Sequence, residues 1–350
     1  MKTSEMEQGA EKVLLKCLAE VPFLKVEQVK QEFATEGGRP DFLIELTLPD
    51  GRQMLVCEVK NSGQPAIARV AINQILRYLG LFPDAYGVFV APYISPQAAR
   101  ICTEEGVGYV DLAGNCRLAF GQVFIQQEGK PNPFAQKRDL RSLYSPKAAR
   151  VLRVMLNNPG RRWKLQPLAD EAQVSLGQAA NVKRLLLDRE CIRAEPEGIA
   201  VSEPQALLTE WGENYNYRRH QISDFYSLKT VAEIEAALAE TCRQEGIKYA
   251  LTGFSGAARV APFVRYQRVT AYVQGDIEGL AQRLGLSRVS SGANVGLWMP
   301  YDEGVFYATQ DYDGARVVSP IQLYLDLRGS RGRGEEAADF LWEQVIKPQW

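Results

Sequence analysis

The chain has 350 residues, a formal net charge of −1 and a single histidine. This length allows two or three domains, and the near-neutral balance gives no overall case for nucleic-acid or membrane binding. One histidine excludes H-E-x-x-H zinc sites and HNH nucleases, so any catalysis here should use carboxylates and lysine. No apolar run reaches the roughly 20 residues of a membrane span, and we expect a cytoplasmic protein with no membrane partner.

Residues 1–136 carry the pattern of an α/β domain, a sheet covered by helices. Apolar residues recur at helical spacing first, and alternating apolar residues then indicate two strands joined by the turn Leu48–Gly51. The expected elements are, in order, a helix at 10–21, strands at 41–48 and 52–60, a helix at 66–82, a strand at 85–94, a helix at 95–106 and a strand pair at 107–120.

Three charged residues lie at one end of the predicted hairpin. Glu58 and Lys60 are two residues apart on a strand and therefore share one face, while Asp41 begins the partner strand. Two neighbouring carboxylates suit Mg²⁺ (or Mn²⁺), which prefers oxygen ligands. A lysine beside such an ion can position a water and stabilise charge on a phosphate. The plainer interpretation is a salt-bridged strand end.

The order Pro40-Asp41, sixteen residues, then Glu58-x-Lys60 resembles the PD-(D/E)XK nuclease superfamily. The resemblance implies a restriction-endonuclease-like fold and Mg²⁺-dependent endonuclease activity on DNA, with Asp41 and Glu58 as metal ligands and Lys60 assisting the water. Domains of this type also serve as non-catalytic DNA-binding or structural modules, so both interpretations stay open.

The same resemblance implies further site residues. Members of the superfamily often carry a polar residue on the following helix, where this chain has Gln74 and Tyr78, and Gln64 is an additional candidate. Many also draw a metal-binding carboxylate from the first helix, for which Glu11 and Glu7 are the candidates.

Residues 137–205 are basic, with a net charge of +5 between two segments of −3 each. Helix, short helix, helix and hairpin over 145–201 are typical of a winged helix-turn-helix. The recognition helix and its approach supply the candidate contacts to base edges or phosphates, namely Ser175, Gln178, Asn181, Lys183, Arg184, Arg161, Arg162 and Lys164. We expect double-stranded DNA as partner and a homodimer. A protein-contact role for the winged helix is the alternative.

Residues 206–350 predict a further α/β domain with strands over 269–276, 293–300 and 304–314 and two helices at the end. A strand followed by Gly253 and Ser255 resembles the start of a nucleotidyltransferase fold. That fold needs a metal-binding D-x-D motif shortly after this point, and the only such motif, Asp311-x-Asp313, comes much later in the sequence. We therefore consider a degenerate nucleotidyltransferase fold. Ser255 alternatively caps a helix. We expect His220 to be an ordinary surface or interface residue.

Several phrases, "GVGYVDLAGNCRL", the winged helix, "LTGFSGAAR", "GANVGLWMP" and "VVSPIQLYLDLRGSRGRGEEAADFLWEQVI", together resemble AbiEi-type antitoxins of type IV toxin–antitoxin systems. In that family the winged helix binds operator DNA, and the rest neutralises a nucleotidyltransferase toxin. Two hypotheses follow for a fold that combines α/β and α+β domains. The first is a DNA-binding protein with a Mg²⁺-dependent endonuclease domain. The second is a non-catalytic antitoxin and transcriptional repressor.

Overall fold

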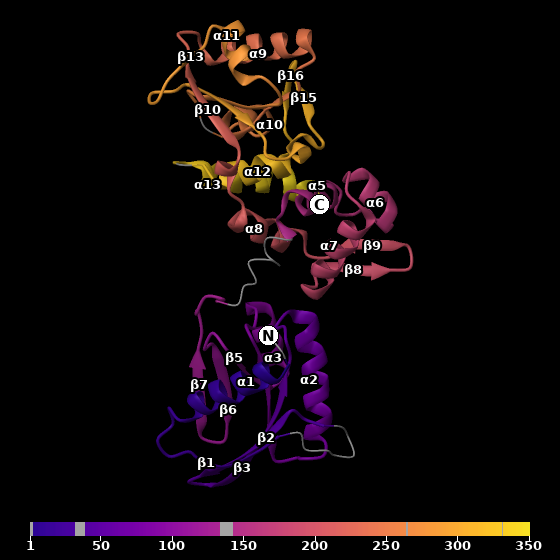
Figure 1. The fold of residues 1–350 in the computed structure, drawn as a ribbon, viewed down its shortest axis with the longest axis vertical. Coiled ribbons are helices and arrows are strands. Elements are labelled where there is room, and N and C mark those ends of the chain that lie inside the picture. Colours follow the sequence, from indigo (N-terminus) through magenta and orange to yellow (C-terminus); the bar gives the residue numbers. More distant parts are fainter. Residues whose placement is uncertain (1–2, 32–38, 134–142, 264, 331) are drawn as a thin grey trace. The chain divides into compact units, whose positions relative to one another are not determined.

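The computed structural model describes residues 3–31, 39–133, 143–263, 265–330 and 332–350, with side chains from residue 6 onward (Figure 1). The chain divides into two units. One contains Met1–Leu140 and Leu186–Glu190, and the other contains Arg141–Leu185 and Cys191–Trp350. The boundary predicted between residues 136 and 137 lies outside the described residues. The winged helix and the last third, expected as separate domains, lie almost entirely in one unit.

The first unit contains a seven-stranded mixed sheet whose strands are ordered as in the chain, β1 to β7. Strands β3, β4 and β5 run parallel, and the other neighbours are antiparallel. The elements are α1 (Thr3–Leu18), β1 (Lys25–Gln31), β2 (Phe42–Leu48), β3 (Gly51–Val59), α2 (Pro65–Leu79), β4 (Ala85–Ala91), α3 (Pro96–Glu104), β5 (Gly108–Asp111), β6 (Cys116–Phe120) and β7 (Val123–Gln127).

The β2–β3 hairpin distributes its side chains between two cores because neighbouring residues on a strand face opposite ways. Phe42 is paired with Cys57, and both pack with α1 in one buried cluster. Leu43 is paired with Val56, and both pack against Tyr78 of α2 on the other face. Glu58, next along β3, therefore faces the α2 side. The expected hairpin is confirmed, whereas edge strands β1 and β7 were not predicted.

The winged helix is formed by α5 (Pro146–Asn157), α6 (Leu165–Glu171), α7 (Leu176–Asp188) and the hairpin of β8 (Ile192–Glu195) and β9 (Gly198–Val201). The wing gains a third strand segment because Trp163 and Ile199 exchange two backbone hydrogen bonds of 2.9 Å. Gly198 makes this possible, since a Cβ there would lie 2.6 Å from the Trp163 carbonyl oxygen and its φ is +145°. The predicted element order is confirmed.

The rest of the second unit contains another seven-stranded mixed sheet, ordered β13-β10-β14-β12-β11-β16-β15. Its helices and strands are α8 (Pro204–Asn214), β10 (Gln221–Tyr226), α9 (Val231–Glu245), β11 (Tyr249–Leu251), α10 (Gly253–Val260), β12 (Val269–Val273), α11 (Ile277–Leu284), β13 (Ser287–Arg288), β14 (Val295–Met299), β15 (Gln310–Tyr312), β16 (Ala315–Val317), α12 (Pro320–Arg328) and α13 (Gly334–Leu341). Short 3-10 turns cover Tyr217–Arg219, Glu303–Phe306 and Lys347–Gln349, and a π-helical turn covers Trp342–Ile346.

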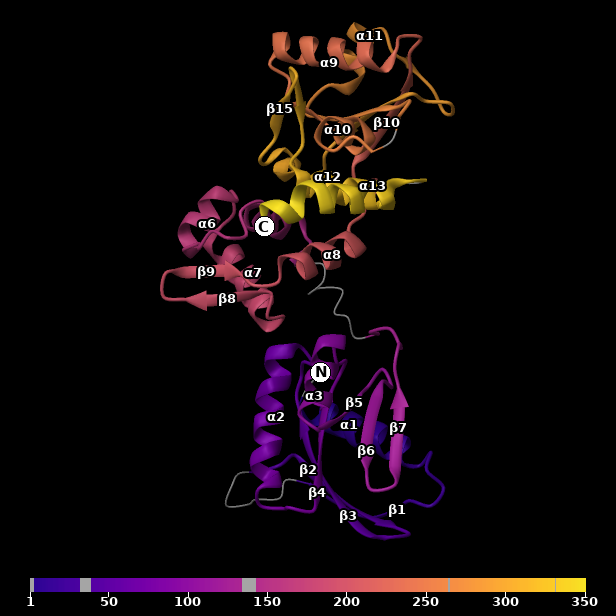
Figure 2. The same cartoon turned by 180° about the vertical axis from the view of Figure 1, so that it is seen from behind.

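Helices lie on both sides of this second sheet. Figures 1 and 2 show α9 and α11 on one side and α12 and α13 on the other. Residues of α9 and α11 such as Leu238 and Leu280 share a buried cluster with the strands. The strand expected over 304–314 is wrong in its first half, where a 3-10 turn over Glu303–Phe306 precedes β15. Strand β10 and helices α9 and α11 were not predicted.

Candidate nuclease centre and nucleic-acid interface

The hairpin brings Asp41 and Glu58 to the same end of the first sheet. Phe42 of β2 and Cys57 of β3 are the last paired residues. Asp41 and Glu58 are the next residue beyond this pair on each side of the hairpin. The backbone N–H of Val59 donates to Asp41 Oδ2 at 2.6 Å, which fixes Asp41 beside the end of β3. The convergence expected of these two carboxylates is therefore present in the structure.

Glu58 is a buried carboxylate, with 3% of its surface exposed. Its Oε1 accepts a hydrogen bond from Lys60 Nζ, and its Oε2 has no partner among the described residues. Burial raises the pKa of Glu58, the negative charge of Asp41 raises it further, and Lys60 and Arg77 act in the opposite direction. Lys60 and Arg77 thus offset part of the effect that burial and Asp41 have on the pKa of Glu58.

Helix α2 supplies polar side chains next to these carboxylates. Tyr78 is buried, and its pKa is raised first by burial and then by the negative charges of Glu58 and Asp41. Gln74, one helical turn earlier, has a buried Oε1 with no hydrogen-bond partner among the described residues. Sequence reasoning did not identify Arg77, whose positive charge acts on both Glu58 and Tyr78.

Glu11 is placed differently from the other proposed ligands. Its Oε2 accepts a hydrogen bond of 2.7 Å from Gln31 Nε2 of the edge strand β1. The described residues contain no group of three or more His, Cys, Asp or Glu side chains that could hold a metal ion. Asp41 and Glu58 are thus brought together, and Glu11 does not complete a third ligand with them in this conformation.

The pair formed by Asp41 and Glu58 fits a magnesium ion in its chemistry. Mg²⁺ usually keeps several waters and takes only one or two protein carboxylates. The orphaned oxygen of Glu58 and the raised pKa of its carboxyl indicate a place where a cation would be favourable. The residues present therefore fit a hydrated divalent cation.

The recognition helix α7 begins as the sequence indicates. The backbone N–H of Gln178 donates to Ser175 Oγ at 3.2 Å, the contact of a helix cap. By contrast, Ser145 occupies the cap position of α5 without a side-chain cap bond. Ser175 and Arg184 are exposed, whereas Gln178, Asn181 and Lys183 are half-buried. Arg184 Nη2 also donates to Asn181 Oδ1 at 3.3 Å.

The basic residues ahead of α6 have partners of their own. Arg162 Nε donates to Glu195 Oε2 of the wing at 2.6 Å. The Arg161 guanidinium lies over the Trp163 ring, 3.7 Å from its centroid. Lys164 is exposed at the start of α6. Ion pairs and ring contacts on an exposed surface are weak, so the side chains of Arg161, Arg162 and Lys164 stay available to a phosphate.

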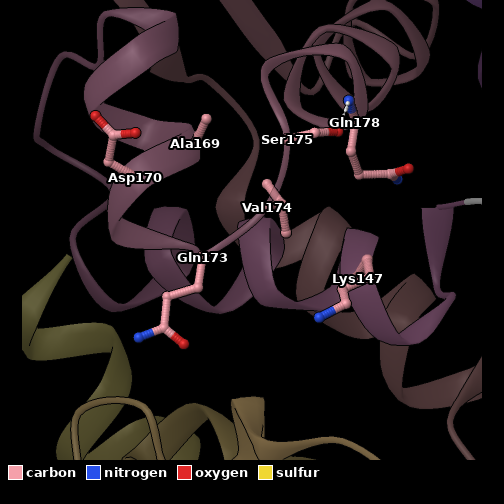
Figure 3. Close-up of a pocket in the computed structure, with 7 residues that line it drawn as sticks. All are labelled: Lys147, Ala169, Asp170, Gln173, Val174, Ser175 and Gln178. Atoms are coloured by element: carbon pink, nitrogen blue, oxygen red, sulfur yellow. Dashed lines mark hydrogen bonds between the residues drawn. The ribbon is translucent and has the colours of Figure 1, made fainter.

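A depression of about 660 Å³ lies at the turn of the helix-turn-helix (Figure 3). Ser175, which precedes α7, and Gln178 of α7 border it, as does Lys147, which projects from the first turn of α5. Lys147 was missed by sequence reasoning because it lies almost thirty residues before the recognition helix. The residues lining the depression are Lys147, Ala169, Asp170, Gln173, Val174, Ser175 and Gln178.

A buried polar network joins α12 to its surroundings. Asp326 is fully buried and accepts hydrogen bonds from Thr252 Oγ1 at 2.5 Å, Tyr215 OH at 2.8 Å and Tyr272 OH at 2.9 Å. Burial raises the pKa of Asp326, and these donors limit the rise. Gln322 Nε2 adds a further donor at 3.0 Å.

The network reaches the winged helix through Arg153 of α5. The Arg153 guanidinium is buried, donates to Gln322 Oε1 at 2.9 and 2.5 Å, and lies 5.0 Å from the Trp211 ring centroid. A second link is the ion pair of Arg150 with Asp302, at 2.8 and 3.0 Å. The winged helix and the last third are therefore held together by charged groups.

Two expectations for the last third need correction. His220 is buried, with 4% exposed, and its Nε2 lies 3.0 Å from Tyr215 OH and 3.2 Å from Tyr272 OH, so it is no surface residue. Ser255 does not cap α10. Its Oγ accepts from the N–H of Thr270 at 2.9 Å and so fastens the helix to β12.

The last part of the chain matches a known protein family. Residues 200–347 match the family model described as "Transcriptional regulator, AbiEi antitoxin, Type IV TA system". No curated protein matches the chain significantly. No helix among the described residues has the length and apolar character needed to cross a membrane.

Solved structures give only distant matches. An EndoMS–dsDNA2 complex is 21% identical over 29% of this chain and 43% of that chain, with a TM-score of 0.22. A repair endonuclease from Pyrococcus abyssi is 18% identical over 29% and 46%, also at 0.22. SfsA from Pyrococcus furiosus with Ca²⁺ is 16% identical over 36% and 64%, at 0.20.

This chain covers less than two thirds of each of those proteins, and likenesses at such TM-scores support no argument about fold or activity. The family model, which covers residues 200–347, is the more informative finding. Residues 200–347 are therefore similar to AbiEi-type transcriptional regulators.

Proposed function

We propose that the protein is a DNA-binding transcriptional regulator of the antitoxin type. The observation that carries the proposal is a winged helix with a capped recognition helix, fastened to a segment that is similar to AbiEi regulators. The +5 charge of residues 137–205 suits a module that faces phosphates. In this role α7 reads duplex DNA, and the last third would bind a nucleotidyltransferase toxin.

The test is a DNA-binding measurement on the full chain with two substitutions in α7. Lys183→Ala should weaken binding to all duplexes alike, because a phosphate contact carries no sequence information. Asn181→Ala should reduce the preference for the operator over a random duplex by about 1–3 kcal/mol. If neither substitution changes duplex binding, the winged helix is not the DNA reader.

A second candidate function is Mg²⁺-dependent hydrolysis of DNA phosphodiesters by the first unit. Asp41 and Glu58 converge beside Lys60, and one Glu58 oxygen is buried without a partner among the described residues. Asp41 and Glu58 would hold the ion, which would polarise the phosphate and lower the pKa of a bound water. Lys60 would hold its ammonium group near the negative charge that develops on the phosphate. Gln74 of α2 would have a positioning role beside them.

Supercoiled plasmid separates the two candidates. The wild-type protein and the Lys60→Ala variant are incubated with plasmid in Mg²⁺, Mn²⁺ or EDTA, and nicking is followed on a gel. Nicking that requires metal and is lost in the variant supports the nuclease. Intact plasmid in every condition, with duplex binding retained in EDTA, supports a regulator whose first unit is architectural.

A further inference from the structure

Planar side chains form a continuous stack where β10 begins and β14 ends. The Tyr217 ring lies 5.2 Å from the Trp298 ring at an interplanar angle of 17°. The His220 ring follows at 6.2 Å from Trp298, at 15°. The Tyr301 ring lies 4.5 Å from His220, at 27°. These rings come from the turn before β10, from β14 and from the segment after it, so the fold itself aligns them.

Each end of this stack is covered by an arginine. The Arg219 guanidinium lies 4.7 Å from the Tyr301 ring centroid, and that of Arg218 lies 6.0 Å from the Tyr217 ring centroid. Stacking of a guanidinium on an aromatic face leaves its N–H edges free and limits its rotamers. The two cations are therefore partly pre-organised, on neighbouring residues, at the surface.

The two arginines at the ends of the stack have no carboxylate partner in the described part of the chain. Both are exposed, and neither forms an ion pair with any residue in the described part of the chain. Arg283, for comparison, pairs with Glu245 at 2.7 Å, and Arg333 pairs with Glu336 at 2.7 Å. The buried indole N–H of Trp298 likewise has no acceptor among the described residues. The stack therefore carries two exposed cations held over aromatic rings, with no carboxylate among the described residues to neutralise them.

We propose that Arg218 and Arg219 form a second nucleic-acid contact that binds duplex phosphates outside the winged helix. A guanidinium held flat presents two parallel N–H donors, which match the oxygens of a phosphate. Phosphate contacts position a protein on the duplex without reading its sequence. The inference rests on the proposed DNA-binding function and adds to it a clamp in the last third of the chain.

The test measures the salt dependence of binding by fluorescence anisotropy, with a fluorescein-labelled random-sequence duplex and the full-length protein. Loss of two phosphate contacts should lower the slope of log K against log[salt] by about 1.8 in the variant with Arg218→Ala and Arg219→Ala. Affinity at low salt should fall on the order of tenfold or more. The matched control carries Arg243→Ala and Arg283→Ala, which remove two exposed but ion-paired arginines.

A third variant, with Arg218→Lys and Arg219→Lys, keeps the charge and removes the planar guanidinium groups that lie over the aromatic rings. It should retain the slope and still lose several-fold in affinity. A slope and affinity unchanged in the double alanine variant would overturn the inference while leaving the winged-helix function intact. An equal loss in the Arg243/Arg283 control would also overturn it. A wild-type protein that binds no duplex rejects the proposed function itself.

Discussion

Glu58 shows how one carboxylate can be costly to the fold and useful to a site. Its burial next to Asp41 opposes ionisation, and only one of its oxygens is paired among the described residues. A buried charge without full compensation destabilises the folded state. Such a group persists most readily where a ligand or cation uses it, which is the pattern expected of functional residues.

Glu58→Gln should therefore stabilise the first unit at neutral pH. A folded-state pKa raised above the ordinary 4.5 means that the stability contributed by the protonated form is lost as pH rises through the folded pKa. The advantage of the variant should shrink as the pH is lowered below 4.5. Urea unfolding midpoints at the two pH values check this, and a variant less stable at neutral pH would contradict it.

Magnesium gives a second measurement on the same pair of proteins. A ligand that binds only the folded state raises its stability by mass action. Mg²⁺ should therefore raise the melting temperature of the wild-type protein and have little effect on Glu58→Gln. Equal shifts in both proteins would show that the ion binds elsewhere.

His220 is the single histidine, so its titration can be read without assignment. Burial, and then the positive charges of Arg153 and Arg219, lower its pKa from 6.5 to about 3. The neutral ring contributes stability at pH above 6.5 that is lost as pH falls toward 3. The proton NMR signal of its ring should stay constant from pH 8 to pH 5. A midpoint near 6.5 would show that the ring is exposed.

The elements that the sequence predicts well are those with a strong local pattern. The β2–β3 hairpin alternates between two cores, and the turn Leu48–Gly51 fixes its register. The winged helix carries cap residues, helical spacing and a Gly at its wing. The proximity of Asp41, Glu58 and Lys60 could be predicted from the sequence because these residues lie on or next to that hairpin.

Other elements carry no such pattern. Strand β1 (Lys25–Gln31) is largely exposed, and its backbone pairs with β2 at the edge of the sheet. The network of Asp326, Tyr215 and Tyr272 joins residues more than fifty positions apart. Periodicity reports local structure, so contacts of this kind stay invisible until the chain is folded.

At the element scale, Ser175→Ala tests the start of the recognition helix. Loss of the side-chain cap on the Gln178 N–H should cost about 1 kcal/mol of unfolding free energy. Ser175→Asn, which keeps a hydrogen-bond acceptor at the cap position, is the matched control and should cost less. Chemical denaturation measures both, and equal costs would show that the cap of α7 is not formed.

For the whole molecule, the decisive feature is the buried link between Arg153 and Gln322. Arg153→Met or Gln322→Leu alone leaves the other side chain buried without its partner, which costs about 1–3 kcal/mol. The double variant should cost less than the sum, with a coupling on the order of 1 kcal/mol or more. Urea denaturation of the four proteins gives the coupling.

The exposed pair of Arg283 with Glu245 provides the control cycle. Exposed ion pairs contribute roughly 0–1 kcal/mol, so its coupling should be small. A coupling free energy for Arg153 and Gln322 no larger than that of the control would mean that their contact does not stabilise the packing of the winged helix against the residues that follow it.

The Arg153 side chain also limits how this winged helix can be reused. Grafted onto an unrelated protein, the helix-turn-helix would carry a guanidinium shaped for Gln322 and Trp211, and it would meet neither. Gene fusion or recombination that exchanges the module alone would therefore be penalised. Exchange of the winged helix together with the segment that follows it would keep the pair intact, so the two are expected to be inherited as one piece.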